Sequence, residues 1–139
     1  MGGSNSIKQV LPAIMNASEL IKSRYRHTIY GAEGGIPSYN FSDHKWVEFD
    51  EAGRVIDPYK LLPTLEELLP VGLDEMDVLF ADEKVGNGGA AMTAWAFMQF
   101  KSMPDNEREA IASALKHYCE LDTMAMVLIW EYFNELTDQ

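Results

Sequence analysis

The sequence predicts a mainly helical α+β fold, in which a long C-terminal helix packs on shorter helices and a β-hairpin forms an insertion. Apolar residues recur at helical spacing near both ends of the chain, whereas residues 45–57 alternate and contain a turn signal. Hydrophobic residues make up 47% of the 139 residues and charged residues 24%, which supplies a core and argues against disorder. The length fits a single domain or a part of one.

The long helix is predicted over residues 106–136, from apolar residues at alternating spacings of four and three. Its predicted core face comprises Ile111, Leu115, Tyr118, Asp122, Ala125, Ile129, Tyr132 and Leu136. Asp122 is out of place there, because a buried carboxylate is costly unless it is paired, protonated or bound to a metal. Tyr118 lies one turn earlier on the same face, so the sequence places a phenol beside this carboxylate.

Residues 1–30 are predicted to form two further helices. The first ends at about Leu11 and kinks or restarts at Pro12, because proline has no amide proton to donate. The second spans residues 17–30, and Asn16 begins it as part of a capping box with the glutamate three residues later.

Residues 31–72 are predicted to be a loop followed by the β-hairpin insertion. Glycine, proline and asparagine mark residues 31–44 as a loop, and its Tyr39 and Phe41 predict that it lies against the body of the protein. The hairpin covers residues 45–57 around an acidic turn that ends in glycine.

Residues 73–139 are predicted to be an acidic connection and two C-terminal helices. The acidic residues of 73–84 lack the central glycine and terminal glutamate of a calcium loop, so we expect a solvated connection. The first of the two helices covers residues 90–101 and is apolar nearly all round, as in a helix buried on several sides. A short helix is also expected over residues 64–69, just before this region.

The composition limits the partners and the compartment. A net charge of −11 and a pI of about 4.5 oppose unaided binding to nucleic acid, since phosphates repel an acidic surface. The single cysteine, Cys119, allows no internal disulfide, fits a reducing compartment and is predicted to be a buried core thiol. No apolar run approaches the ~20 residues that span a bilayer, so we expect a cytoplasmic protein without membrane contact.

Two residues remain as candidates for chemistry once the common motifs are excluded. His27, His44 and His117 lie too far apart in sequence for a close ligand pair, and a single cysteine rules out a zinc cluster. Neither a nucleotide-binding loop nor a nucleophile motif is present. For Asp122 two interpretations stay open: it accepts hydrogen bonds in the core, or it binds Mg²⁺ or Mn²⁺ while Tyr118 positions a water.

Four blocks of the chain resemble, in the same order, one bacterial family of unknown function. They are GSNSIKQVLP at residues 3–12, DPYKLLP at 57–63, GGAA at 88–91 and YCELDTMAMV at 118–127. The members of that family look like the tyrosine subclass of DEDD 3′–5′ exonucleases, which have a ribonuclease H-like fold and a last motif of Tyr-x-x-x-Asp. The resemblance covers nearly the whole chain but only the C-terminal half of the family, so the N-terminal sheet strands are lacking.

The resemblance implies a site with two metal ions, Mg²⁺ or Mn²⁺, that activate a water against the terminal phosphodiester of a nucleic acid. Asp122 is then a metal ligand and the fourth carboxylate, and Tyr118 is the catalytic residue that orients the attacking water. The other three carboxylates have no counterpart here and are expected before Met1. Glu120 matches the family block but points away from Asp122, so it receives no ligand role. We therefore expect this chain alone to be inactive and to bind no metal tightly.

A second hypothesis belongs to another class, a helical interaction or scaffold domain that keeps the fold without the chemistry. The carboxylates that would separate the two hypotheses lie outside this sequence. We also expect a homo-oligomer or a loosely packed monomer, because residues 90–101 and the last helix present more apolar surface than the chain covers.

Overall fold

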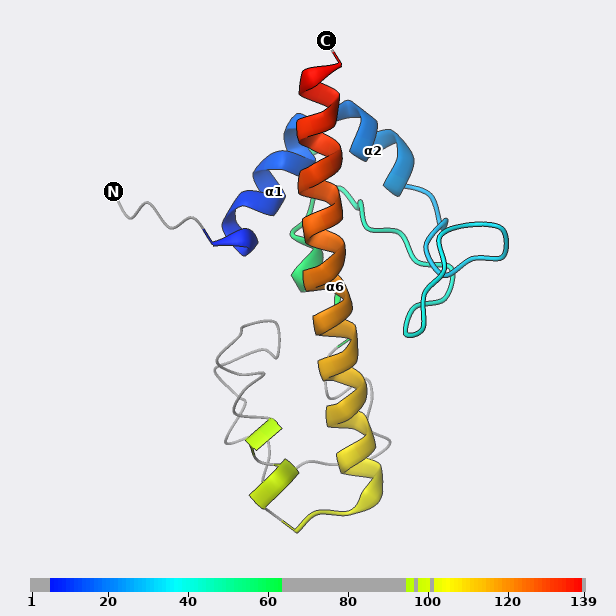
Figure 1. The fold of residues 1–139 in the computed structure, drawn as a ribbon, viewed down its shortest axis with the longest axis vertical. Coiled ribbons are helices and arrows are strands. Elements are labelled where there is room, and N and C mark those ends of the chain that lie inside the picture. The colour runs from blue at the N-terminus through cyan, green and yellow to red at the C-terminus, as the bar shows by residue number, and fades with distance from the viewer. Residues whose placement is uncertain (1–5, 64–94, 97, 101, 139) are drawn as a thin grey trace. The chain divides into compact units, whose positions relative to one another are not determined.

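The computed structural model describes residues 6–63, 95–96, 98–100 and 102–138, and it is mainly helical, as predicted (Figure 1). Its elements are α1 (Ile7–Ala17), α2 (Glu19–Tyr25), the 3₁₀ helix η1 (Pro58–Leu61) and α6 (Asp105–Thr137). Residues 95–96 and 98–100 are also helical. The predicted helix over 64–69, the acidic connection over 73–84 and most of the predicted helix over 90–101 lie outside the described residues.

The chain divides into two compact units. Met1–Leu61 and Glu120–Gln139 form the first, and Leu62–Cys119 forms the second. Within the first unit, α1 and α2 lie beside the C-terminal part of α6 (Figure 1). Residues from the two ends of the sequence therefore build one core.

Helix α1 continues through Pro12, so the predicted end at Leu11 is wrong. An interior proline costs about 3 kcal/mol, because it removes one hydrogen bond and crowds the preceding turn. The same helix buries Leu11, Ile14 and Met15, which are 6% exposed or less. Each buried side chain of this size contributes about 1.5–3 kcal/mol, so burial on both sides of the proline outweighs its cost.

Helix α2 is shorter than predicted and is capped by a different residue. Its N-cap is Ser18, whose hydroxyl oxygen accepts a backbone N–H of the first turn at 3.0 Å. The helix ends at Tyr25, not at Tyr30. Asn16, the predicted cap, instead accepts a hydrogen bond from the backbone amide of Val55 at 2.9 Å. Residues after Tyr25 leave the helix to enter the aromatic core described next.

The loop that follows α2 is folded against an aromatic core. Tyr30 forms isolated β-bridges with Ile36 and His44, which close the loop on itself. The rings of Tyr30, Phe41 and Trp46 pack edge to face with centroids 4.9–5.9 Å apart. Phe41 is buried and anchors the loop as predicted, whereas Tyr39 is fully exposed and takes no part in this packing.

In the segment predicted as a β-hairpin, the structure has one antiparallel bridge, between Phe49 and Val55, and no strand. The turn itself forms where predicted. A carboxylate oxygen of Asp50 accepts the backbone amides of Ala52 and Arg54, both at 2.9 Å. The side chain of Asp50 thus satisfies backbone amides within the turn.

Helix α6 spans 33 residues and agrees with the predicted helix to within one residue at each end. Its buried residues are Ala110, Ile111, Ala114, Tyr118, Leu121, Met124, Ala125 and Leu128. The buried stripe therefore runs through Leu121 and Leu128, next to the predicted Asp122 and Ile129, which are partly exposed. Leu136 is half-exposed, and its assignment to the core is wrong.

Cys119 is exposed on α6, so the prediction of a buried thiol is also wrong. It lies on the side of the helix away from the buried stripe. Its apolar neighbours in sequence suggested burial but did not show which side of the helix it occupies.

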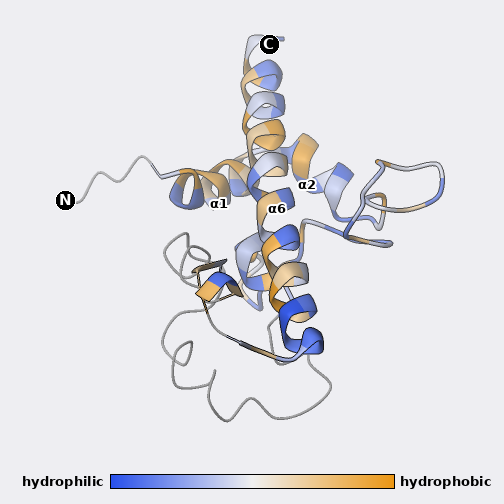
Figure 2. Cartoon of the chain, turned by 60° about the horizontal axis from the view of Figure 1, so that its bottom comes forward, coloured by the Kyte–Doolittle hydropathy of each residue, from blue (hydrophilic) through white to orange (hydrophobic). Residues whose placement is uncertain are grey.

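The described helices carry apolar residues without forming a membrane span. Figure 2 shows hydrophobic residues, in orange, along both α1 and α6. No helix of the described part of the chain is long and apolar enough to cross a membrane.

Candidate functional site around Asp122

Asp122 lies at the edge of the buried stripe of α6 and is partly exposed. One of its carboxylate oxygens, Oδ1, accepts a hydrogen bond from the phenol of Tyr59. Tyr59 is 8% exposed and belongs to η1, where its backbone N–H donates to Asp57 Oδ1 at 3.0 Å. The 3₁₀ turn thus fixes the backbone from which the phenol reaches the carboxylate.

A cation lies over the ring of this phenol. The ammonium nitrogen of Lys8, in α1, lies 5.3 Å from the centroid of the Tyr59 ring. A cation at this distance is attracted to the ring face, and the contact is worth about 0.5–1 kcal/mol where it is exposed to water. Tyr59 of η1 therefore contacts the Lys8 ammonium of α1 through its ring and the Asp122 carboxylate of α6 through its hydroxyl.

Tyr118, the tyrosine predicted beside Asp122, is buried one turn earlier on the same helix. It belongs to the second compact unit, whereas Asp122 belongs to the first. The hydrogen-bond donor that the structure gives Asp122 is Tyr59. Sequence reasoning did not identify Tyr59 as a partner of Asp122, although Tyr59 lies in the block at residues 57–63 that carries the resemblance.

The residues described do not by themselves fit a two-metal centre. Among them, no group of three or more histidine, cysteine, aspartate or glutamate side chains is placed to hold a metal ion. Two metal ions need several carboxylates, and Asp122 is the one that the resemblance supplies. A metal at Asp122 would need ligands beyond these residues.

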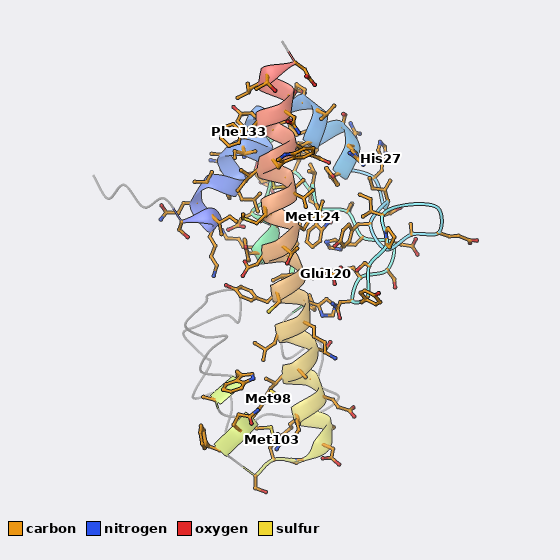
Figure 3. All side chains as sticks on the ribbon, viewed as in Figure 1. His27, Met98, Met103, Glu120, Met124 and Phe133 are labelled. Atoms are coloured by element: carbon orange, nitrogen blue, oxygen red, sulfur yellow. The ribbon has the colours of Figure 1, made fainter. Side chains whose placement is uncertain are left out.

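Glu120, which is labelled on α6 in Figure 3, belongs to a different hydrogen-bond network. Its Oε1 accepts the hydroxyls of Tyr30, at 2.8 Å, and of Ser38, and its Oε2 accepts the side-chain amide of Asn40 at 2.5 Å. Burial alone would raise the pKa of Glu120, but the hydrogen bonds from Ser38, Asn40 and Tyr30 outweigh it and lower that pKa. Both oxygens of the carboxylate thus accept hydrogen bonds from the loop that follows α2.

Two more carboxylates of α6 hold the N-terminal helices. Glu131 Oε1 accepts the phenol of Tyr25 at 2.8 Å and the guanidinium of Arg24 at 3.0 Å. Glu135 accepts the hydroxyl of Ser18, the same residue that caps α2. Local sequence patterns carry no signal for these pairs, because the partners lie more than a hundred residues apart.

The burial of two tyrosines changes their acidity. Burial raises the pKa of Tyr25 well above its usual value, and the hydrogen bond to the Glu131 carboxylate raises it further. Burial also raises the pKa of Tyr30, with the hydrogen bond to Glu120 as the next cause. Both phenols are therefore held in the neutral form in which they donate a hydrogen bond.

Three of the four blocks that carry the family resemblance meet at Tyr59, the residue that donates a hydrogen bond to Asp122. Lys8 belongs to residues 3–12, Tyr59 to residues 57–63 and Asp122 to the final block. The block at residues 88–91 lies outside the described residues. The structure thus brings together in space residues that were singled out only by their pattern in sequence.

The described part of the chain is thus a mainly helical protein, and carboxylates of its last helix accept hydrogen bonds from Ser18 and Tyr25 of the N-terminal segment. No family model, curated protein or solved structure matches the chain.

Proposed function

We propose that this chain is the C-terminal part of a metal-dependent 3′–5′ exonuclease-like protein with a ribonuclease H-like fold, and that the chain is inactive by itself. The observation that carries the proposal is the meeting of three resemblance blocks at Tyr59, the hydrogen-bond donor of Asp122.

In this proposal Asp122 supplies one carboxylate to a Mg²⁺ or Mn²⁺ site that is completed by carboxylates outside this sequence. Such ions activate water and stabilise the leaving oxygen in phosphodiester cleavage. Tyr59 holds the Asp122 carboxylate in one orientation through its hydrogen bond. Tyr118 is the residue proposed to orient water, on the strength of the resemblance. The nucleic acid is a partner of the complete protein, since a net charge of −11 opposes binding by this chain.

A second candidate function is a non-catalytic helical interaction or scaffold domain. The observation that favours it is that Asp122 accepts a hydrogen bond within the fold, as Glu120, Glu131 and Glu135 do. A carboxylate used in this way has a structural role and needs no metal. The cytoplasmic location expected from the sequence is compatible with both functions.

The deciding experiment is a Mn²⁺-dependent degradation assay on end-labelled single-stranded DNA and RNA. The longest natural protein that contains this segment is compared with its Asp122→Asn variant and with the present chain alone. If the proposal holds, the long protein shortens the substrate from its 3′ end, and both the variant and the chain alone are inert. Asp122→Asn keeps the shape and the hydrogen-bond acceptor, so the loss reports on charge and metal binding.

Tyr59→Phe is the matched control, because it removes the hydrogen bond to Asp122 and leaves the carboxylate. We expect Tyr59→Phe to keep measurable activity and to lower the rate of degradation less than Asp122→Asn does. A well-folded long protein without activity, or an equally active Asp122→Asn variant, would favour the scaffold function. Circular dichroism of every variant ensures that lost activity is not lost folding.

A further inference from the structure

The side of α6 away from its core carries a regular stripe of exposed, uncharged residues, here named the outer seam. It consists of Thr123, Met126, Trp130, Phe133 and Thr137, all of them exposed. Met126, Trp130 and Phe133 are 63%, 66% and 56% exposed. Phe133 projects from the C-terminal part of α6 in Figure 3. Side chains of this size are rarely left in water without a partner surface.

The spacing of the outer seam is that of a coiled-coil interface. Its residues follow one another at alternating intervals of three and four, which is the a and d pattern of a heptad repeat. Val127 and Leu136 flank it and are 42% and 49% exposed, so the apolar surface is wider than a single row. A surface of this geometry fits another helix packed lengthwise along α6.

The charge distribution favours a second copy of this chain as the occupant. Two chains that each carry a net charge of −11 repel each other least where they meet across an uncharged surface, and the outer seam has no charged residue. The nearby Glu131 and Glu135 are turned away to accept hydrogen bonds from α2 and its N-cap. The fold thus removes negative charge from the one helical face on which two copies would meet.

We propose that two copies of this chain pair through the outer seam, with the two α6 helices antiparallel. The seam and its flanking residues expose roughly 500 Å² of apolar side chain per copy, on the order of 1,000 Å² for a pair. An interface of this size is at the lower end of specific complexes, so we expect a reversible dimer with a dissociation constant on the order of micromolar.

The antiparallel direction follows from the residues that then face each other. It pairs Met126 of one copy with Trp130 of the other, twice, and Thr123 with Phe133. A thioether against an aromatic ring is a favourable contact, and the small threonine leaves room for the larger ring. Antiparallel helices also oppose their dipoles, whereas a parallel pair aligns them.

The association is tested by sedimentation equilibrium of the full chain between 1 and several hundred micromolar, an interval of concentrations that brackets a weak dimer. We expect a concentration-dependent dimer, and we expect Trp130→Glu and Met126→Glu each to weaken it by at least about a hundredfold, because each change enters the interface twice. Tyr39→Glu introduces the same charge at a fully exposed site outside the seam and should leave the association unchanged. A chain that is monomeric throughout, or a dimer that Trp130→Glu leaves intact, would overturn the proposal.

Cys119 makes the direction measurable, because it lies one step before Thr123 on the same spacing. In the antiparallel pair the two Cys119 residues are separated by roughly 27 Å, too far for a disulfide. Cys119 of one copy instead lies at the level of Thr137 of the other. Under copper–phenanthroline oxidation we expect a covalent dimer from Thr137→Cys, and none from the natural chain or from Thr137→Cys combined with Cys119→Ser. Rapid covalent dimerisation of the natural chain would show a parallel pair and refute the antiparallel arrangement.

Discussion

Replacement of Glu120 by alanine removes the acceptor of three hydrogen bonds at once. The donors are the hydroxyls of Tyr30 and Ser38 and the side-chain amide of Asn40. Hydrogen bonds to a charged group contribute about 1.5–3 kcal/mol each when buried, and partly buried donors recover some of this from water. We therefore expect Glu120→Ala to lower the free energy of unfolding by about 3 kcal/mol and the midpoint temperature by about 10 °C.

The assay is urea unfolding followed by circular dichroism, with Glu19→Ala as the control. The Glu19 side chain is 85% exposed, so its removal should cost below about 0.5 kcal/mol. A double-mutant cycle with Asn40→Ala should give a coupling energy of about 1–2 kcal/mol. Equal effects of Glu120→Ala and Glu19→Ala, or a coupling energy of zero, would refute the reasoning.

The same network predicts a loss of stability in acid. Because the folded protein lowers the pKa of Glu120, its contribution is complete above the unfolded value of about 4.3 and disappears as the pH falls through the folded value. At pH values below about 4, the free energy of unfolding of the natural chain should therefore decrease, and it should decrease less steeply for Glu120→Ala. Parallel pH profiles for the two proteins would contradict the assignment.

Three further predictions concern the backbone and the buried phenols. Pro12→Ala should raise the free energy of unfolding by about 1 kcal/mol, because it restores a helical hydrogen bond and loses part of that gain to a freer unfolded chain; an unchanged urea midpoint would contradict it. Burial and carboxylate hydrogen bonds raise the pKa of Tyr25 and Tyr30, so their contribution to stability is complete below about pH 10 and is lost as the pH rises toward the folded values. In absorbance at 295 nm, the ionisation that Tyr25→Phe or Tyr30→Phe removes should lie above the usual pH range of a phenol, and an ionisation within that range would contradict the prediction. Gly31→Ala should cost more than about 2 kcal/mol in urea unfolding, since φ is +70° and a Cβ would collide with a backbone carbonyl. Gly34→Ala, with a similar φ but open space around it, should cost only about 1 kcal/mol.

The helices were predictable from the sequence to the extent that their signals are local. The apolar periodicity of residues 106–136 is long enough to define α6 almost to the residue. The register of its core was less certain, because alternating steps of three and four from Ile111 reach either Leu121 or Asp122. Tertiary packing decided for Leu121, which is fully buried.

The partners of the candidate site were beyond local prediction. Tyr59 lies 63 residues before Asp122, and Tyr30 lies 90 residues before Glu120. No periodicity links residues so far apart, and a solvent-facing glutamate looks the same in sequence as one held by three donors. Asp122 itself was recognisable because a carboxylate next to an apolar stripe demands an explanation.

The division of the first unit between the two ends of the chain has a consequence for synthesis. Residues 1–61 leave the ribosome before residues 120–139, on which Ser18, Arg24 and Tyr25 depend for their hydrogen bonds. At typical elongation rates the intervening segment takes roughly 3–12 s to make. During that interval the aromatic residues of the early segment lack the helix that completes their core. The first unit can therefore complete its core only after α6 has been translated.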